Sequence, residues 1–384
     1  RALLDEVQYN STGDTLVHVG DIVAKGTLYG SQTVLEFMAA RAVRGVRGNH
    51  DQKVVEWRGW VEWIRPMEGG AGGRWLDGLE SALRAQEEEA DGRGDDGGVD
   101  ADAFVEAAIK RGKKDRRWWD RVPEGWKLLG DHYQIARSMT ADQYAYLKSL
   151  PLILHLPSEH AFIVHAGLLP YDPRHPMLGS GQPLSHAPRS SGGGGGIAER
   201  RAAQERAVLV DIPQNRDPWV VLNMRNVLHN HEVSKETKRG KAWTSVWNTV
   251  VDKCAGFDAP QTEHDVSDDK WMPCEPMTVV YGHTASRGLD VHRWTLGLDS
   301  GCVYGRRLTA LVLDRAHAHR KGKVLRRADD ADDDDEKAAK EDAKAQEHGI
   351  VAFGDDGQAR LVSVKCHKHR EKKQTGDLPG RAKG

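Results

Sequence analysis

The sequence of 384 residues contains no run of about 18 apolar residues, the length that a membrane-spanning helix needs. We therefore predict no membrane segment in the sequence given. It also lacks an excess of either charge, because 55 Lys and Arg against 57 Asp and Glu leave a formal net charge of −2. Composition thus gives no support for sequence-specific nucleic-acid binding or for a polycationic partner.

Cysteine is scarce, and the four present are irregularly spaced without a Cys-x-x-Cys pair: Cys254, Cys274, Cys302 and Cys366. Free thiols in a reducing compartment are the interpretation we favour, with a disulfide between two of them as the alternative. The chain opens on Arg1 within a helical pattern, so its first residues say nothing about targeting. A cytoplasmic location is the default, and a vacuolar one the alternative if a preceding segment carries an anchor.

Several short segments have the composition of buried strands. They are rich in β-branched residues and bounded by Gly, Pro or Asp: Thr15–Val19, Phe162–His165, Thr278–Tyr281 and Leu308–Leu313. Helical patterns follow the first strand at Thr27–Ala40 and precede the second at Asp142–Leu150. Strands that alternate with helices indicate an α/β or layered α+β domain.

Three stretches differ from this core in composition. Glu68–Asp102 is rich in Gly, Glu and Asp and is expected to be a mobile insertion. Gln182–Gly196 ends in a run of glycines, which predicts a flexible loop. Arg315–His348 has a basic part followed by an acidic one, and we expect it to be either disordered or a solvated helix.

After the charged stretch the chain returns to a strand pattern. Val351–Phe353 and Ala359–Val364 flank a Gly-Asp-Asp-Gly turn, which predicts a hairpin that rejoins the core sheet. The sequence therefore divides into a main domain at 1–314, with insertions at about 68–117 and 182–205, a charged segment at 315–348, a closing hairpin at 349–366 and a polar tail at 367–384.

Four short motifs carry side chains that can bind metal ions. Each follows a predicted strand or lies in a glycine-rich turn: Gly20–Gly26, Gly48–Asp51, Val164–Gly167 and Tyr281–Thr284. Since open sheets build their sites at the carboxyl ends of strands, we expect the four motifs to meet there. Their donors are one Asp, one Asn and two His, a mixed oxygen and nitrogen set that suits Zn, Mn, Fe or Co better than Ca or Mg.

Each motif has a plain alternative when it is taken alone. Gly, Asn and Asp favour turns, so Gly48–Asp51 could be a surface turn. His165 alone would more often be a core histidine bonded to the backbone, and His18, inside a predicted strand, is interpreted in that way. Four such motifs in one order are harder to explain by chance, so we favour a metal site.

In this order, the motifs GD-x-V-x-K-G, GNHD, VHAG and GHT resemble those of the calcineurin-like metallophosphoesterases. The sequence is closer to the ApaH-like phosphatases, which are similar to bacterial diadenosine tetraphosphatase and to the fungal zinc-dependent endopolyphosphatases. Val220–Arg225 and Gly297–Tyr304 extend the resemblance. The resemblance implies a layered αββα sandwich, an α+β fold, and a phosphoesterase activity that uses two divalent ions.

The resemblance also implies a role for each motif residue. Asp21 would bridge both metal ions, and three residues would complete the second site: Asn49, His165 and His283. His50 would be the general acid that protonates the leaving oxygen. Lys25 and Arg225 would hold the phosphate, the guanidinium being suited to bidentate contact.

The sequence departs from the family pattern in two ways. Family members begin with a strand that ends in Gly-Asp-x-His-Gly and supplies two ligands of the first metal, whereas this chain opens at the following helix. We therefore expect the first core strand and half of the first metal site to be missing from the sequence given. In phosphoprotein phosphatases an Asp pairs with the catalytic histidine and an Arg follows, where this chain has Ala24 and Lys25. Asp51 is our candidate for the residue that orients His50.

The resemblance leaves several substrates open. We favour phosphoanhydrides, with polyphosphate first, hence an endopolyphosphatase; nucleotide polyphosphates and RNA caps come next. A serine/threonine protein phosphatase is disfavoured by Ala24, and a one-metal phosphate-binding pseudoenzyme is the alternative outside enzymes. Of three basic clusters, 110–117, 235–241 and 365–373, we expect 235–241 to lie near the site. Trp243 and Trp247, four residues apart, are interpreted as core packing.

Overall fold

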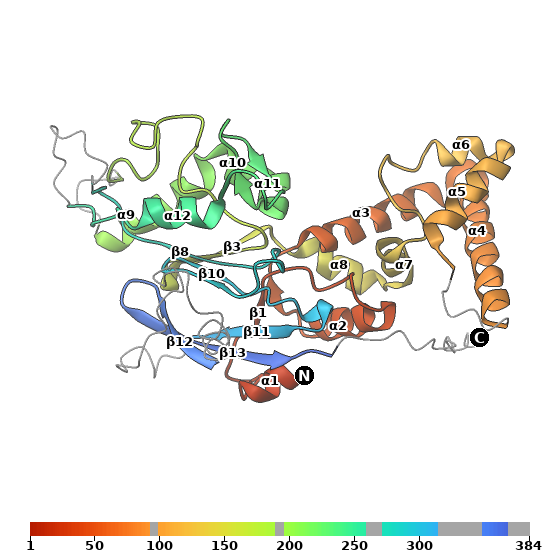
Figure 1. Ribbon diagram of the computed structural model, residues 1–384, viewed down its shortest axis with the longest axis horizontal. Coiled ribbons are helices and arrows are strands. Elements are labelled where there is room, and N and C mark those ends of the chain that lie inside the picture. Colours follow the sequence, from red (N-terminus) through yellow and green to blue (C-terminus); the bar gives the residue numbers. More distant parts are fainter. Residues whose placement is uncertain (93–98, 189–195, 259–270, 314–347, 368–384) are drawn as a thin grey trace, which may run out of the picture.

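A five-stranded sheet forms the centre of the computed structural model, which describes residues 1–92, 99–188, 196–258, 271–313 and 348–367 (Figure 1). In spatial order its strands are β3 (Ile153–Leu156), β4 (Ala161–Val164), β8 (Thr278–Tyr281), β10 (Thr295–Gly297) and β9 (Asp290–Val291). The inner strands β4, β8 and β10 are parallel, and the edge strands β3 and β9 are antiparallel to their neighbours.

Successive residues of the central strands point to opposite faces of this sheet and enter different hydrophobic clusters. On β4, Phe162 and Val164 pack with helices, whereas Ala161 and Ile163 pack with the second sheet. Both faces are therefore covered. This explains why the predicted strands are continuous apolar runs instead of alternating ones.

Helices cover one face of the sheet: α9 (Ile197–Val210), α10 (Pro213–Arg216), α11 (Pro218–Asn223) and α12 (Trp243–Val251). Trp243 and Trp247 of α12 are fully buried in the cluster with Phe162 and Tyr281. The interpretation of this tryptophan pair as core packing is confirmed. A small antiparallel sheet lies beside these helices, in the order β6 (Val233–Ser234), β5 (Asn226–Val227) and β7 (Lys241–Ala242).

A second sheet covers the other face, in the order β11 (Arg307–Val312), β13 (Gly357–Lys365) and β12 (His348–Phe353). The predicted hairpin is present as β12 and β13, and it pairs with β11. Helix α1 (Ala2–Glu6) lies against β11 and β13 on the outer side. The layers are helix, sheet, sheet and helix, so the predicted α+β sandwich is confirmed. Strands β1 (Val17–His18) and β2 (Arg44–Gly45) form a separate parallel pair.

A block of helices lies beside the sandwich, at the right in Figure 1. It contains α2 (Leu28–Ala40), α3 (Asn49–Ile64), α4 (Met67–Gly92), α5 (Ala101–Arg111), α6 (Arg116–Trp119), α7 (Asp131–Ser138) and α8 (Ala141–Ser149). Short 3₁₀ turns occur at Lys113–Asp115, Pro157–Glu159 and Cys302–Tyr304. Within the described ranges, no helix combines the length and apolarity needed to cross a bilayer.

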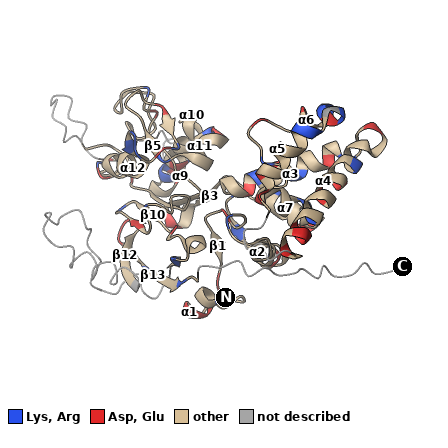
Figure 2. Ribbon diagram, turned by 45° about the vertical axis from the view of Figure 1, so that its right-hand side comes forward, with Lys and Arg blue, Asp and Glu red and all other residues tan. Residues whose placement is uncertain are grey.

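Most of the stretch predicted as a mobile insertion at Glu68–Asp102 is ordered helix instead. After a kink with positive φ at Glu68, Gly69 and Gly70, α4 continues to Gly92, and α5 begins at Ala101. Residues 93–98 lie outside the described residues, so the prediction stays open for them. Trp75 and Leu76 are buried against Phe104 and Trp118 from α5 and α6. A Cβ at Gly72 would lie 2.2 Å from the carbonyl oxygen of Ile64, so this glycine permits close packing. Both signs of charge lie along the exposed faces of α4, α5 and α6 (Figure 2).

Residues 182–188 of the loop predicted at 182–196 contain no helix or strand, as expected, and residues 189–195 lie outside the described residues. Helix α9 begins at Ile197 and is anchored by buried Arg201, which donates to Asp355 at 2.7 Å. Residues 314–347 and 368–384 also lie outside the described residues. The expectations for the charged segment, for the basic cluster at 365–373 beyond His367 and for the polar tail therefore stay predictions. The domain boundaries also stay predictions.

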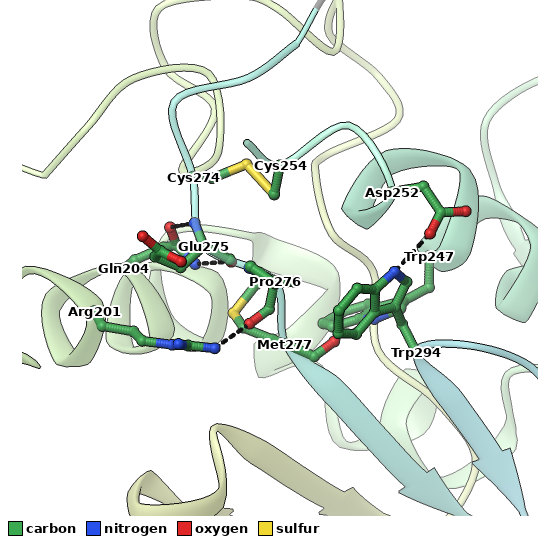
Figure 3. Close-up of a disulfide and its surroundings, with 10 residues drawn as sticks. All are labelled: Arg201, Gln204, Trp247, Asp252, Cys254, Cys274, Glu275, Pro276, Met277 and Trp294. Atoms are coloured by element: carbon green, nitrogen blue, oxygen red, sulfur yellow. Dashed lines mark hydrogen bonds between the residues drawn. A yellow bond between two sulfur atoms is a disulfide. The ribbon is translucent and has the colours of Figure 1, made fainter. Parts of the chain in front are cut away.

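The expectation of free thiols is wrong, because all four cysteines form disulfides: Cys254–Cys274 and Cys302–Cys366. The first disulfide joins the chain just after α12 to the segment that leads into β8 (Figure 3). Trp294, drawn in the same view, donates to Asp252 at 2.6 Å. The second joins the turn after β10 to the end of β13. The partners are 20 and 64 residues apart, so sequence spacing gave no sign of the pairing.

The disulfides predict a redox-dependent stability. Replacing Cys254 and Cys274 together by Ser should lower the unfolding free energy by about 3 kcal/mol, because the unfolded chain regains the entropy of a closed loop. Chemical denaturation of wild type and variant measures this difference. Titration of denatured, unreduced protein should detect no thiol, and four after reduction. Four thiols before reduction would contradict both disulfides.

Candidate metal centre

The turn after β1 places Asp21 through an unusual backbone. Gly20 and Asp21 have φ values of 89° and 52°, in the left-handed region that favours glycine. Gly48 lies directly opposite, and a Cβ there would be 2.1 Å from Oδ1 of Asp21. Both glycines are therefore needed for two loops to approach each other, as the sequence predicts for the motif glycines.

Four predicted ligands converge at the carboxyl ends of β1, β4 and β8 and the first residue of α3. Asn49 Oδ1 lies 3.0 Å from His165 Nε2 and 3.0 Å from His283 Nδ1. The two histidine nitrogens are 3.2 Å apart, and His165 Nε2 is 3.3 Å from Asp21 Oδ2. Such spacings are those between neighbouring ligands that each lie about 2.1 Å from one ion.

The second nitrogen of each histidine is bonded to the backbone. His165 Nδ1 donates to the carbonyl of Val19 at 2.9 Å, and His283 Nε2 donates to that of Asn223 at 3.3 Å. These bonds leave a lone pair on His165 Nε2 and on His283 Nδ1, the two nitrogens that face each other. Two lone pairs at this distance repel unless a cation lies between them, so the residues fit a divalent metal ion.

The electrostatics of the centre favour the same arrangement. Burial disfavours charge on Asp21, yet the adjacent His165 ring, by charge and hydrogen bond, holds the pKa of Asp21 well below its usual range. Against the opposing effect of burial, Asp21 in turn raises the pKa of His165, so the His165 ring holds a proton beside Asp21 that a bound ion would displace. Burial and the neighbouring His165 lower the pKa of His283 to about 3, so its ring is neutral and can donate a lone pair. A carboxylate and neutral imidazole are the protonation states that a metal ion binds.

Four side chains among the described residues lie close enough together to hold one ion: Asp21, Asn49, His165 and His283. The part of the chain that the structure describes contains one cluster of this kind, and in it Asp21 is the carboxylate that a second ion could share. Asp299, in the turn after β10, also lies within electrostatic range of Asp21, and burial raises the pKa of Asp299. Asp299 lies in Gly297–Tyr304, the stretch that extends the family resemblance, but it was not among the predicted site residues.

Asp51 does not orient His50, contrary to the sequence-based candidate role. Its fully buried carboxylate instead accepts four backbone N–H groups, from Asp21 at 2.9 Å, Ile22 at 3.0 Å, Val23 at 3.3 Å and Gly48 at 2.8 Å. Burial and then the charge of Asp21 raise its pKa, and the N–H groups of Gly48 and Val23 oppose that shift. Asp51 therefore ties the loop that carries Asp21 to the start of α3.

His50 contacts a residue that the sequence analysis missed. Its Nδ1 lies 2.7 Å from Nε2 of His132, whose Nδ1 lies 2.6 Å from Oδ1 of Asp131. Asp131 and His132 are the first two residues of α7. His132 lies 82 residues after His50, so no local sequence pattern connects them. His18, predicted as a core histidine, bonds to Tyr146 at 3.0 Å and to the N–H of Gly20.

The two predicted phosphate residues lie on different sides of the centre. Arg225 donates from Nη2 to the carbonyl of His283 at 3.3 Å, and its buried Nε has no hydrogen-bond partner among the described residues. Arg287 lies beside it and donates to the carbonyl of Arg225, with Nη1 also unpartnered in that part of the chain. Lys25 is exposed and lies close enough to His50 to lower the pKa of that ring, after the larger effect of burial.

Comparison with known proteins agrees with this geometry. The calcineurin-like phosphoesterase family profile matches residues 1–155. Over this segment the chain is similar to that family. The segment includes Asp21, Asn49 and His50, whereas His165 and His283 lie beyond it and join the same centre through the fold.

One curated protein and one solved structure are similar to parts of this chain. Bis(5′-nucleosyl)-tetraphosphatase, symmetrical, from Paraburkholderia phymatum is 48% identical over 46 residues, 12% of this chain. The chain spans 16% of the length of that relative. A crystal structure described as a candidate diadenosine tetraphosphatase aligns over 80% of each chain with 22% identity and a TM-score of 0.38.

The ligand geometry predicts a metal affinity that depends on the converging side chains. Replacing His283 by Ala should weaken Mn²⁺ or Zn²⁺ binding by more than about 100-fold, since even residues behind the ligands change affinity by 10- to 100-fold. Titration calorimetry measures this on the metal-free protein. His175→Ala, at an exposed histidine away from the centre, is the control. Equal affinity in both variants would rule out the site.

The contacts of Asp51 predict a structural role. Asp51→Ala should lower the unfolding free energy by about 3 kcal/mol, because four N–H groups lose their acceptor in a buried place. Asp51→Asn keeps one acceptor oxygen and should lose less. Denaturant titration gives both values. A variant that keeps wild-type stability but loses turnover would instead show that Asp51 acts in the chemistry.

Proposed function

We propose that this protein is a metal-dependent hydrolase of phosphoanhydrides, and that inorganic polyphosphate is its main substrate. The observation that carries the proposal is the position of two arginines with unpartnered N–H groups beside the four-ligand metal centre. Arg225 bonds directly to the backbone of the ligand His283, so its guanidinium lies next to any phosphate held at the ion. Buried N–H donors without partners fit an anion with several acceptor oxygens.

The chemistry follows from the positions of the side chains. Asp21, Asn49, His165 and His283 would hold a divalent ion, whose charge would polarise a phosphoryl oxygen and activate water. Arg225 and Arg287 hold the phosphate and offset its developing negative charge. His50, beside Asp21 and Asn49, donates a proton to the leaving oxygen, and Lys25 lies next to it on the exposed side of the centre.

Polyphosphate is favoured by the basic loop at 235–241, which leads from β6 into β7. Arg225 donates from Nη1 to the carbonyl of Lys235 at 3.0 Å, which fixes the start of the loop beside the centre. The loop carries exposed cations: Lys235, Lys238, Arg239 and Lys241. Of these, Lys238 and Arg239 line a surface hollow, and Arg239 also pairs with Glu236 at 3.9 Å. A linear polyanion can contact such a row at several phosphates, whereas a phosphoprotein offers a single one.

A dinucleoside polyphosphate is the second candidate, and the 46-residue similarity to the bacterial tetraphosphatase favours it. A protein phosphatase is disfavoured because Ala24 stands where those enzymes place the carboxylate that pairs with the catalytic histidine. A phosphate-binding module with one metal ion is the alternative outside enzymes. It would bind the same anions without turning them over.

The proposal predicts which substrate is hydrolysed. With Mn²⁺, Zn²⁺, Co²⁺ or Mg²⁺ added, the chain should shorten long polyphosphate internally, faster than it cleaves diadenosine tetraphosphate or a phosphopeptide. Arg225→Lys should raise KM for polyphosphate by roughly 10-fold, because one bidentate donor pair is lost. Gel analysis of chain length and phosphate release provide the measurements.

Arg74→Lys, an exposed arginine on α4, is the matched control and should leave KM unchanged. Preference for diadenosine tetraphosphate would move the substrate to the second candidate, and preference for the phosphopeptide would refute the anhydride proposal. Metal-dependent binding of polyphosphate without turnover of any substrate would establish the binding module instead.

A further inference from the structure

His50 is in contact with a histidine and carboxylate pair from a different part of the chain. We propose that His132, held by Asp131, is the positioning residue that fixes the His50 ring for proton transfer. This inference rests on the proposed hydrolase activity. It concerns the step in which the leaving oxygen receives its proton.

The contact between the two rings is a hydrogen bond and not stacking. The ring planes are within 13° of each other, their centroids are 5.0 Å apart and the facing nitrogens are 2.7 Å apart. Stacked rings keep their planes at van der Waals distance, so stacking cannot place two nitrogens at hydrogen-bond distance. The rings therefore meet edge to edge, as a directional N–H···N bond requires.

The carboxylate of Asp131 determines the direction of this bond. His132 Nδ1 donates to Asp131 Oδ1 at 2.6 Å, which leaves an acceptor lone pair on His132 Nε2. His50 Nδ1 must then be the donor, and the free Nε2 of His50 is the nitrogen that can pass a proton to the substrate. The acid is the doubly protonated ring: its Nε2 proton passes to the leaving oxygen as the P–O bond breaks and water adds to phosphorus, and the neutral ring that results keeps its Nδ1–H bonded to His132.

The rest of α7 holds this pair in place. Tyr133, the next residue, is buried with its ring 5.3 Å from Trp57 of α3, the helix that also carries His50. Its hydroxyl donates to Glu80 of α4 at 2.6 Å. His132 is 14% exposed, so little water competes for its nitrogen. A packed side chain from each neighbouring helix therefore fixes where His132 meets His50.

The pair also compensates for a missing group. Ala24 has no polar side chain, so the loop after β1 cannot supply a carboxylate to His50. The N–H of Lys25 in the same loop instead lies 3.5 Å from Asp131 Oδ2, which brings Asp131 to the edge of that loop. Asp131 thus acts on His50 through one intervening imidazole, and its pKa is held well below the usual range chiefly by the hydrogen bond to His132.

The test uses substrates whose leaving oxygens differ in their need for a proton. The phenoxide of phenyl phosphate needs a proton in order to leave, whereas the 2,4-dinitrophenolate of 2,4-dinitrophenyl phosphate leaves as a stable anion. His132→Phe, which keeps a ring but cannot accept, should lower kcat for phenyl phosphate by about 10- to 100-fold and for the dinitrophenyl ester by less than about 3-fold. KM should stay unchanged for both. His132→Gln, whose amide oxygen can accept, should recover part of the loss.

His175→Gln, at an exposed histidine, is the control and should leave both rates unchanged. Equal losses on the two esters, a change in KM alone, or no change in His132→Phe would overturn the inference while the hydrolase proposal stands. Failure of the wild type to hydrolyse any ester or anhydride would instead refute the proposed function.

A second measurement needs no turnover. Long-range ¹H–¹⁵N spectra of the ring nitrogens report which one carries the proton in a neutral histidine. In wild type His50 should carry it on Nδ1, and in His132→Phe the two tautomers should mix. An identical His50 spectrum in both proteins would show that His132 does not fix the ring, whatever the activity.

Discussion

The buried carboxylate of Asp51 is the interaction on which the metal centre depends. It accepts the N–H groups of Gly48 and of three successive residues that begin at Asp21. Without an acceptor these N–H groups would be buried and unsatisfied, so one side chain holds two loops in contact. Asp21 then meets the N–H of His50 at 2.9 Å, and the ligand and the proposed acid share one rigid turn.

Backbone carbonyls complete the arrangement from the other side. Val19 and Asn223 accept the outer N–H groups of the two histidine ligands, so each ring presents a lone pair to the same point. The ligand positions therefore follow from main-chain hydrogen bonds in the sheet and in α11. The geometry of the centre thus does not depend on surface side chains. The choice of substrate is instead set by the cations around it: Arg225, Arg287 and the basic loop.

The block of helices α2 to α8 supports the centre, a role that its glycine-rich composition does not indicate. Glycines such as Gly72 permit close contact between helices, and buried tryptophans fill the space that the block encloses. Helix α7, packed in that block, brings His132 to His50. The predicted insertion supports the site through α7, because Glu80 of α4 accepts the hydroxyl of Tyr133, the neighbour of His132.

The sequence by itself determined the layered fold, the central strands and the four motifs whose side chains converge. Short apolar runs and glycine-flanked ligands are local signals, and a parallel sheet brings strand ends to one edge wherever they lie in the chain. Only the tertiary structure decided the function of Asp51, the contact between His132 and His50 and the pairing of the cysteines. These depend on distances between residues that are far apart in sequence. The glycine-rich stretch differs from its predicted mobility for a related reason. Glycine permits both flexibility and close packing, and only the residues that surround Gly72 in the fold decide between them.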